Sequence, residues 1–128
     1  MVPYNGGWSE AGIYRSGLEI NHPLVVRKTE SHGGTLPKRW GFLTVSHGNV
    51  VTSALKPGPE GSAILRVYEA GGKSADGVKI TFAATPVPGY DANLVEETGR
   101  KLDVSDGLRF NLRAYEIKTF KLQFGKSK

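Results

Sequence analysis

The chain has 128 residues, a formal net charge of +5 at pH 7 and no cysteine. A chain of this length forms one domain, which buries roughly two-thirds of its unfolded surface. Without cysteine, disulfides, cysteine-ligated zinc and a cysteine nucleophile are excluded, and a reducing cytoplasm is the expected location. The longest apolar runs fall short of the ~18–20 residues that a transmembrane helix needs, so we expect no membrane span.

The first part of the chain, residues 1–38, is expected to be an irregular connector from the end of a preceding β domain. Ser9 predicts the start of a short helix of one or two turns running toward Leu18, and two glycines within it weaken it. Pro23 ends any helix, because a proline drives the residue before it out of the α region. The opening residues lack the basic and apolar regions of a secretory signal and are compatible with an internal start.

The rest of the chain, residues 39–128, alternates β-rich runs with turn sequences rich in Gly, Pro and Asn. This pattern, with turns every 8–12 residues or so, is typical of an antiparallel β-sandwich. We therefore predict an all-β fold, a sandwich of about seven short strands that follows an irregular N-terminal connector. The predicted strands are 24–28, inside the connector, and then 42–45, 49–55, 62–69, 78–82, 90–97, 108–113 and 115–124.

Alternation within the strands predicts which side chains are buried. In 62–69, Leu65 and Val67 are expected in the core. Residues 85–89 are expected to break strand pairing because they contain two prolines, and Leu94 is the expected inward residue of the next strand. In the last strand the apolar residues change from odd to even positions. A β-bulge near Lys118 and Thr119 would keep them on one face and is therefore predicted.

The search for catalytic chemistry yields no recognised constellation. The three histidines, His22, His32 and His47, stand at no known catalytic or metal-ligand spacing. His47 is interpreted as a hairpin corner and His32 as solvated or a possible ligand. The Gly71–Ser74 stretch ends like a phosphate-binding loop but lacks the glycine that should precede it. We therefore assign no catalytic, cofactor-binding or metal-binding residue to this chain.

Two binding interpretations rest on residue type. Trp8 and Trp40 are possible sugar contacts, since aromatic rings stack on sugar rings; the alternative places Trp40 in the core and Trp8 against a neighbouring domain. The positive charge permits nucleic-acid binding, but Lys and Arg are spread along the chain rather than clustered. We expect a solvated basic surface and no nucleic-acid partner.

Six segments, taken in order, resemble the C-terminal end of glycoside hydrolase family 38 α-mannosidases. They span nearly the whole chain and are Pro-x-x-Gly-x-Trp at 3–8, Leu-Glu-Ile-Asn-His-Pro-Leu at 18–24, Asn-Val-Val-Thr-Ser-Ala-Leu-Lys at 49–56, Ile-Leu-Arg-Val-Tyr-Glu-Ala-Gly at 64–71, Asn-Leu-Val-Glu at 93–96 and Tyr-Glu-Ile-Lys-Thr at 115–119. One segment departs from the family pattern: bacterial and cytosolic members typically show Pro-His-x-Gly-Asp-Trp where this chain has Pro-Tyr-Asn-Gly-Gly-Trp.

The resemblance implies a terminal β-sandwich module with its upstream connector. In that family the N-terminal domain carries a zinc ion and the aspartate nucleophile of a retaining hydrolysis of α-mannosides. Neither the zinc ligands nor the nucleophile fall in the matching region, so none transfers to this chain, which we expect to be inactive alone. The implied partners are the preceding domains of the same enzyme. The alternative function is an independent carbohydrate-binding β-sandwich.

Overall fold

The computed structural model describes residues 3–35 and 37–125. The chain divides into two compact units, Met1–Trp40 and Gly41–Lys128. The described residues contain one α-helix, in the first unit, and none of their helices is long and apolar enough to cross a membrane.

In the first unit, helix α1 spans Ile13–Asn21 and buries none of its residues. It begins after Gly12, whose φ of 65° lies in the left-handed region. The predicted start at Ser9 is therefore wrong, because the position before the helix is a left-handed glycine without a side-chain cap. The end at Asn21 lies where Pro23 predicts it.

The predicted strand at 24–28 is absent. Leu24, Val25 and Val26 are 94%, 89% and 88% exposed, in a segment without strand pairing. A β-branched run favours an extended backbone, but a strand needs a partner that shares its hydrogen bonds. The described part of the chain supplies none here.

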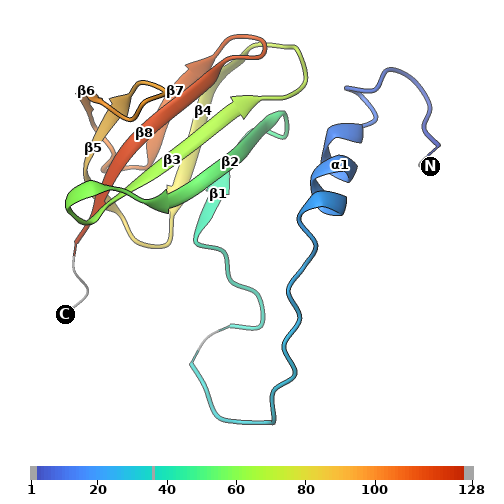
Figure 1. Ribbon diagram of the computed structural model, residues 1–128, viewed down its shortest axis with the longest axis horizontal. Helices are drawn as coiled ribbons and strands as arrows, with labels where there is room; N and C mark the ends of the chain where they lie inside the picture. The colour runs from blue at the N-terminus through green and yellow to red at the C-terminus, as the bar shows by residue number, and fades with distance from the viewer. Residues whose placement is uncertain (1–2, 36, 126–128) are drawn as a thin grey trace. The chain divides into compact units, whose positions relative to one another are not determined.

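The second unit is an antiparallel β-sandwich, which confirms the predicted fold class. One sheet has three strands in the order β1-β4-β7 and the other has five in the order β2-β3-β8-β5-β6 (Figure 1). The strands are β1 Leu43–Val45, β2 Val50–Pro57, β3 Ser62–Glu69, β4 Ala75–Phe82, β5 Pro86–Ala92, β6 Thr98–Leu102, β7 Leu108–Leu112 and β8 Ile117–Phe124.

The core lies between the two sheets and is made of the inward side chains that alternation predicts. Leu65 and Val67 of β3 are fully buried, as are Ile80 of β4 and Leu108 of β7. Ile64 is also fully buried although it points to the opposite face of β3. The loop at Gly58 covers it, since a Cβ at Gly58 would lie 3.0 Å from Ile64 Cγ1.

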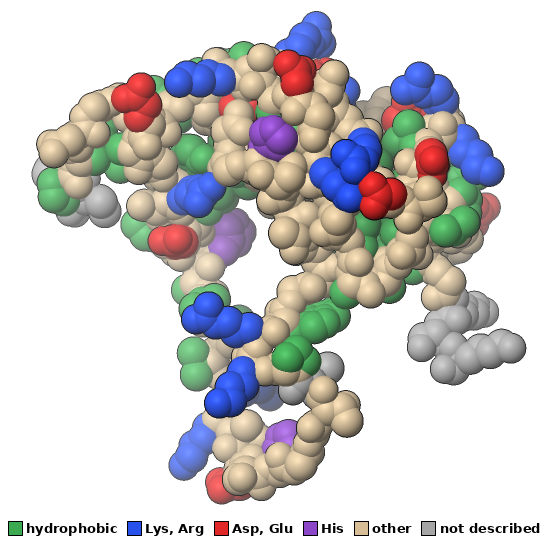
Figure 2. All heavy atoms as spheres, turned by 180° about the vertical axis from the view of Figure 1, so that it is seen from behind, with side chains coloured by type: hydrophobic (Ala, Val, Ile, Leu, Met, Phe, Trp, Pro, Cys, Tyr) green, Lys and Arg blue, Asp and Glu red, His purple; other side chains and the backbone are tan. Residues whose placement is uncertain are grey.

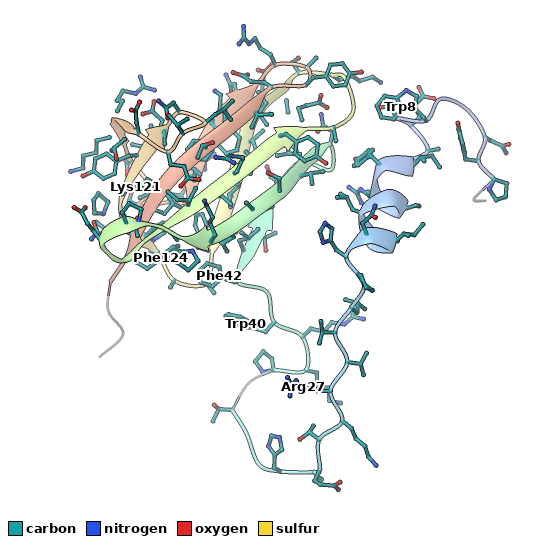
Figure 3. The ribbon with its side chains drawn as sticks, viewed as in Figure 1. Trp8, Arg27, Trp40, Phe42, Lys121 and Phe124 are labelled. Atoms are coloured by element: carbon teal, nitrogen blue, oxygen red, sulfur yellow. The ribbon has the colours of Figure 1, made fainter. Side chains whose placement is uncertain are left out.

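An aromatic cluster closes one end of the sandwich. Phe42, just before β1, and Phe124 of β8 come from the two different sheets, and their ring centroids lie 5.3 Å apart in an edge-to-face arrangement (Figure 3). Phe82 of β4 lies 5.8 Å from Phe124 and 6.3 Å from Phe42. Such edge-to-face pairs add about 0.5–1.5 kcal/mol each beyond the area that they bury.

The connection between β1 and β2 crosses from one sheet to the other. The two strands do not pair, because β1 pairs with β4 and β2 pairs with β3. His47 therefore lies in an inter-sheet connection, and its interpretation as a hairpin corner is wrong. Its Nδ1 lies 2.7 Å from Ser46 Oγ, which accepts a hydrogen bond from the backbone N–H of Lys79.

Three features between residues 85 and 106 differ from the predictions. Residues 86–89 join β5, pairing Pro86 with Phe124 and Gly89 with Leu122, because a register shift between these pairs accommodates the prolines. Leu94 is 61% exposed in a loop rather than inward in a strand. Residues 98–102 carry charges and a glycine, a composition that predicts a turn, yet they form the edge strand β6.

The predicted bulge in β8 is absent. The β3–β8 ladder runs without interruption, with Val67 opposite Lys118 and Arg66 opposite Thr119. No bulge is needed, because Ile117 is 50% exposed on the outer face while Phe120 is buried on the inner face. The apolar residues of this strand thus serve both faces of the sheet.

Candidate functional site

An arginine organises the outer face of the five-stranded sheet, the face that points away from the three-stranded sheet. Arg66 of β3 donates from Nε to Thr119 Oγ1 at 3.1 Å, and from Nη2 to the Leu94 carbonyl at 2.9 Å and to Glu96 Oε1 at 3.4 Å. Lys56 of β2 forms a 2.7 Å ion pair with the same carboxylate. We call these five residues the Arg66 network; it ties three strands to one loop.

The loop in question, residues 93–97, is held in a defined conformation. Asn93 Oδ1 accepts hydrogen bonds from the backbone N–H groups of Val95 at 3.1 Å and Glu97 at 3.0 Å. Glu96 adopts a left-handed φ of 69°, a conformation that costs a non-glycine residue free energy. The loop leaves Leu94 and Val95 61% and 75% exposed, so the Arg66 network presents two aliphatic side chains at a defined position.

A second network surrounds the buried carboxylate of Glu69, which is 1% exposed at the end of β3. Its Oε1 accepts hydrogen bonds from Asn49 Nδ2 at 2.9 Å and the Gly71 N–H at 2.6 Å. Its Oε2 accepts from the N–H groups of Gly72 at 2.8 Å and Tyr115 at 3.0 Å. This Glu69 network joins the residue before β2, the turn after β3 and the turn before β8.

The turn after β3 and the turn before β8 are also in direct contact. Gly72 has a φ of 74°, which glycine adopts without strain. The hydroxyl end of the Tyr115 side chain lies where a Cβ at Gly72 would collide with it. Tyr115 itself has a φ of 60°, and this strained conformation directs its backbone N–H to Glu69.

The pKa of Glu69 results from two opposed effects. Burial raises the pKa, whereas hydrogen bonds from Tyr115, Gly71, Asn49 and Gly72 lower it. The hydrogen bonds prevail, so the pKa lies below the ordinary value of 4.5. The carboxylate is therefore ionised at neutral pH and acts as the acceptor that the four donors require.

We expect acid to destabilise the sandwich through this group. A carboxyl whose pKa is lower in the folded than in the unfolded state stabilises the fold fully above the unfolded pKa, and this contribution is lost as the pH falls through the folded pKa. The free energy of unfolding should thus decline below about pH 4.5. Urea unfolding of the wild type and of Glu69→Gln across this range measures the effect. An equally steep decline in the variant would contradict it.

A groove opens between the two sheets at the edge strands β6 and β7. Its volume is about 670 Å³, and its walls come from β5, β6, β7, β8 and the 93–97 loop. The phenyl rings of Phe110 and Phe120 lie 4.8 Å apart in its wall. Asp91, Arg100 and Asn111 add polar groups from both sheets. We call this feature the inter-sheet groove.

On the face of the sandwich that Figure 2 shows, the Lys and Arg side chains are interspersed with Asp and Glu. Asp106, for example, accepts hydrogen bonds from Arg109 Nη2 at 2.8 Å and Lys79 Nζ at 2.9 Å. These two cations lower its pKa to about 2. The absence of a nucleic-acid partner stays a prediction.

The two tryptophans proposed from the sequence as sugar contacts belong to neither network and do not line the groove. Trp8 and Trp40 belong to the first unit and are 46% and 61% exposed (Figure 3). The interpretation of Trp40 as a core residue is therefore wrong, while sugar contact by either ring stays a prediction. The part of the chain that the structure describes brings no three His, Asp or Glu side chains together as a metal site would require.

Sequence reasoning overlooked Arg66 and Glu69 as site residues. For Glu69 a signal exists, since it stands in phase with the core residues Leu65 and Val67 and is separated by only one residue from the Gly71-Gly72 turn. A carboxylate in an inward position needs several donors, and turn N–H groups provide them.

The fold is that of an antiparallel β-sandwich domain. Its buried carboxylate, Glu69, accepts hydrogen bonds that stabilise turns. Residues 49–120, more than half of the chain, match the family model described as the glycosyl hydrolases family 38 C-terminal beta sandwich domain, and the chain belongs to this family. This confirms the resemblance inferred from the sequence. No curated protein and no solved structure matches the chain.

The two networks join separate segments of the sequence that resemble this family. The Glu69 network joins three of the resembling segments, 49–56, 64–71 and 115–119. The Arg66 network links all three of these to the segment 93–96. These four segments lie within the matched region, whereas those at 3–8 and 18–24 precede it.

Proposed function

We propose that this chain is the non-catalytic C-terminal module of a retaining, zinc-dependent α-mannosidase, and that it packs on the preceding domains of that enzyme. The observation that carries the proposal is the family match over residues 49–120. The hydrolysis and the zinc ion are assigned to the parent's catalytic domain. The described residues of this chain gather no ligand set that fits zinc, so no step of the reaction is assigned to them.

The hydrogen bonds of the buried Glu69 carboxylate support a structural role for this chain. A catalytic carboxylate must keep a lone pair or a proton available for the substrate. Both oxygens of Glu69 instead accept two hydrogen bonds each from the protein itself. The group therefore serves to hold the residue before β2 and the two turns next to β3 and β8 together.

The outer face of the five-stranded sheet supports packing against another domain. Leu94, Val95 and Ile117 are all at least half exposed there. They line a hollow of about 480 Å³ together with Ala92, Asn93 and Thr119. Exposed apolar side chains that border a hollow mark an interaction surface, and the Arg66 network fixes its shape before contact, which limits the entropy lost on docking.

The full-length protein that contains this chain is expected to hydrolyse an aryl α-mannoside in a zinc-dependent manner. Residues 41–128 alone should not do so with added zinc. The parent lacking residues 41–128 should lose activity at a lower temperature than the intact enzyme, because it exposes the apolar surface that the module covers. Assays of released aryl alcohol at increasing temperature measure all three.

Three outcomes would contradict the proposal. Turnover by the isolated module would place catalytic groups in it. A full-length protein inactive on α-mannosides, with zinc present and an intact fold by circular dichroism, would remove the assigned reaction. Equal thermal inactivation of the intact and shortened enzymes would remove the packing role.

A further inference from the structure

An asparagine or aspartate directly precedes a glycine at three places in the chain. They are Asn5-Gly6, Asp76-Gly77 and Asp106-Gly107. At such a place the backbone nitrogen of the glycine can attack the side-chain carbonyl carbon of the residue before it and close a cyclic succinimide. Glycine favours this attack, because it has no Cβ to obstruct the approach and restricts the backbone least. The three places differ in what holds the glycine nitrogen.

The first pair, Asn5-Gly6, lies in an exposed bend of the first unit. Neither residue forms a hydrogen bond to another residue that the structure describes. Apart from the chain neighbours of Gly6, only Glu10 Oε2 among the described atoms comes within 4 Å of where a Cβ at Gly6 would lie, at 3.3 Å. A backbone without hydrogen bonds or close packing rotates at little cost in free energy. The Gly6 nitrogen can therefore reach Asn5 Cγ.

The second pair, Asp76-Gly77, lies in β4, and its glycine nitrogen is engaged. The N–H of Gly77 donates to Asn111 Oδ1 of β7 at 2.8 Å. The acceptor reaches it where a register shift between Ala75 and Val78 interrupts the β4–β7 ladder. This hydrogen bond must break before the nitrogen can lose its proton and attack Asp76. The side chain of Asn111 therefore protects this pair.

The third pair, Asp106-Gly107, is protected in two ways. The N–H of Gly107 donates to the Val104 carbonyl at 3.1 Å. The carboxylate of Asp106 accepts hydrogen bonds from Lys79 and Arg109, which lower its pKa to about 2. The carboxylate is therefore ionised at neutral pH, and its negative charge repels a nucleophile. The neutral amide of an asparagine has no such protection.

We propose that Asn5 is a site of spontaneous modification at which the chain forms isoaspartate, and that the hydrogen bonds of Gly77 and Gly107 keep the two Asp-Gly pairs intact. The Gly6 nitrogen gives its proton to solvent and bonds to Asn5 Cγ. The Cγ–Nδ2 bond breaks, and the amide group takes up a proton and leaves as ammonia. Water then opens the ring: attack at the backbone carbonyl carbon gives isoaspartate, and attack at Cγ gives aspartate. No oxidant or reductant takes part.

The modification changes both charge and backbone. Either product places a carboxylate in the segment 3–8, so the formal net charge of +5 falls by one. Isoaspartate also lengthens the backbone by one atom ahead of helix α1. The inference does not rest on the proposed function, because the reaction needs only Asn5, Gly6 and water.

The test compares the full chain with a synthetic peptide of residues 1–12, both kept at neutral pH for several weeks. Mass spectrometry of proteolytic fragments measures the exchange of NH₂ for OH, and enzymatic methylation of isoaspartate measures the rearranged product. The rate at Asn5 in the full chain should lie within about tenfold of the rate in the peptide, a barrier difference below about 1.4 kcal/mol. Asn5→Gln is the matched control. It should abolish the conversion, because the longer side chain would have to close a larger ring.

A second variant, Asn111→Ala, tests the protecting hydrogen bond. Asn111 is exposed, so its truncation leaves the core intact and frees the N–H of Gly77. Isoaspartate formation at Asp76 should rise about three- to tenfold, the rate equivalent of one hydrogen bond, while the rate at Asp106 stays unchanged. The proposal would be overturned by a rate at Asn5 more than about tenfold below that of the peptide. It would also be overturned by an unchanged rate at Asp76 in Asn111→Ala, or by an equal rise at Asp76 and Asp106.

Discussion

Glu69→Gln is expected to lower the free energy of unfolding of the sandwich by about 2–4 kcal/mol. The carboxylate oxygens each accept two hydrogen bonds, from Asn49 and Gly71 on one side and from Gly72 and Tyr115 on the other. In glutamine one of these oxygens becomes an NH₂ group. Whichever it is, two part-buried donors then face another donor and lose their acceptor.

Urea unfolding at neutral pH measures this loss. The matched control is Glu60→Gln, because Glu60 is exposed and its carboxylate lies 3.8 Å from Lys121 Nζ at the other end of β3. An exposed ion pair of this length contributes at most about 1 kcal/mol. Equal effects of the two substitutions would show that the Glu69 network does not hold the turns together.

Arg66→Ala is expected to lower the free energy of unfolding by about 1–3 kcal/mol and to release the 93–97 loop. The substitution leaves the buried Thr119 hydroxyl and the Leu94 carbonyl without their donor. It also leaves Glu96 with Lys56 as its remaining cation. The loop's backbone amides should then exchange faster with solvent, since local opening costs less free energy.

Hydrogen exchange at the Val95 and Glu97 amides, together with urea unfolding, tests this expectation. Arg113→Ala provides the control, because the Arg113 side chain is 87% exposed and pairs with Glu116 at 3.5 Å. Arg66→Lys should recover only part of the loss, since one ammonium group cannot reach three acceptors in the fork geometry of a guanidinium. Unchanged exchange of the two amides in Arg66→Ala would refute the anchoring role of the arginine.

Local alternation predicts strands well where one face is buried and the other is solvated. In β4 and β7, Val78, Ile80 and Leu108 alternate with polar residues, and all three are fully buried as expected. Turn-forming residues predict the ends of strands less well. The prolines of 85–89 predict a break, yet β5 runs through them because a register shift accommodates them.

The errors about strands and burial share one physical cause, which is that pairing and burial depend on distant segments. Residues 24–28 have strand composition but no partner strand among the described residues, so they stay exposed. Residues 98–102 have turn composition but pair with β5. The exposure of Trp40 follows from its place before the first strand of the sandwich rather than within it.

Sequence alone determined the all-β class, the main core positions and the family, because residue alternation, turn residues and ordered segments are local properties of the chain. Only the tertiary structure decided that Arg66 and Glu69 unite those segments. Each of these contacts joins residues far apart in sequence through strand register and sheet order. Hydrogen-bond pairing across strands sets both properties, and local composition does not encode it.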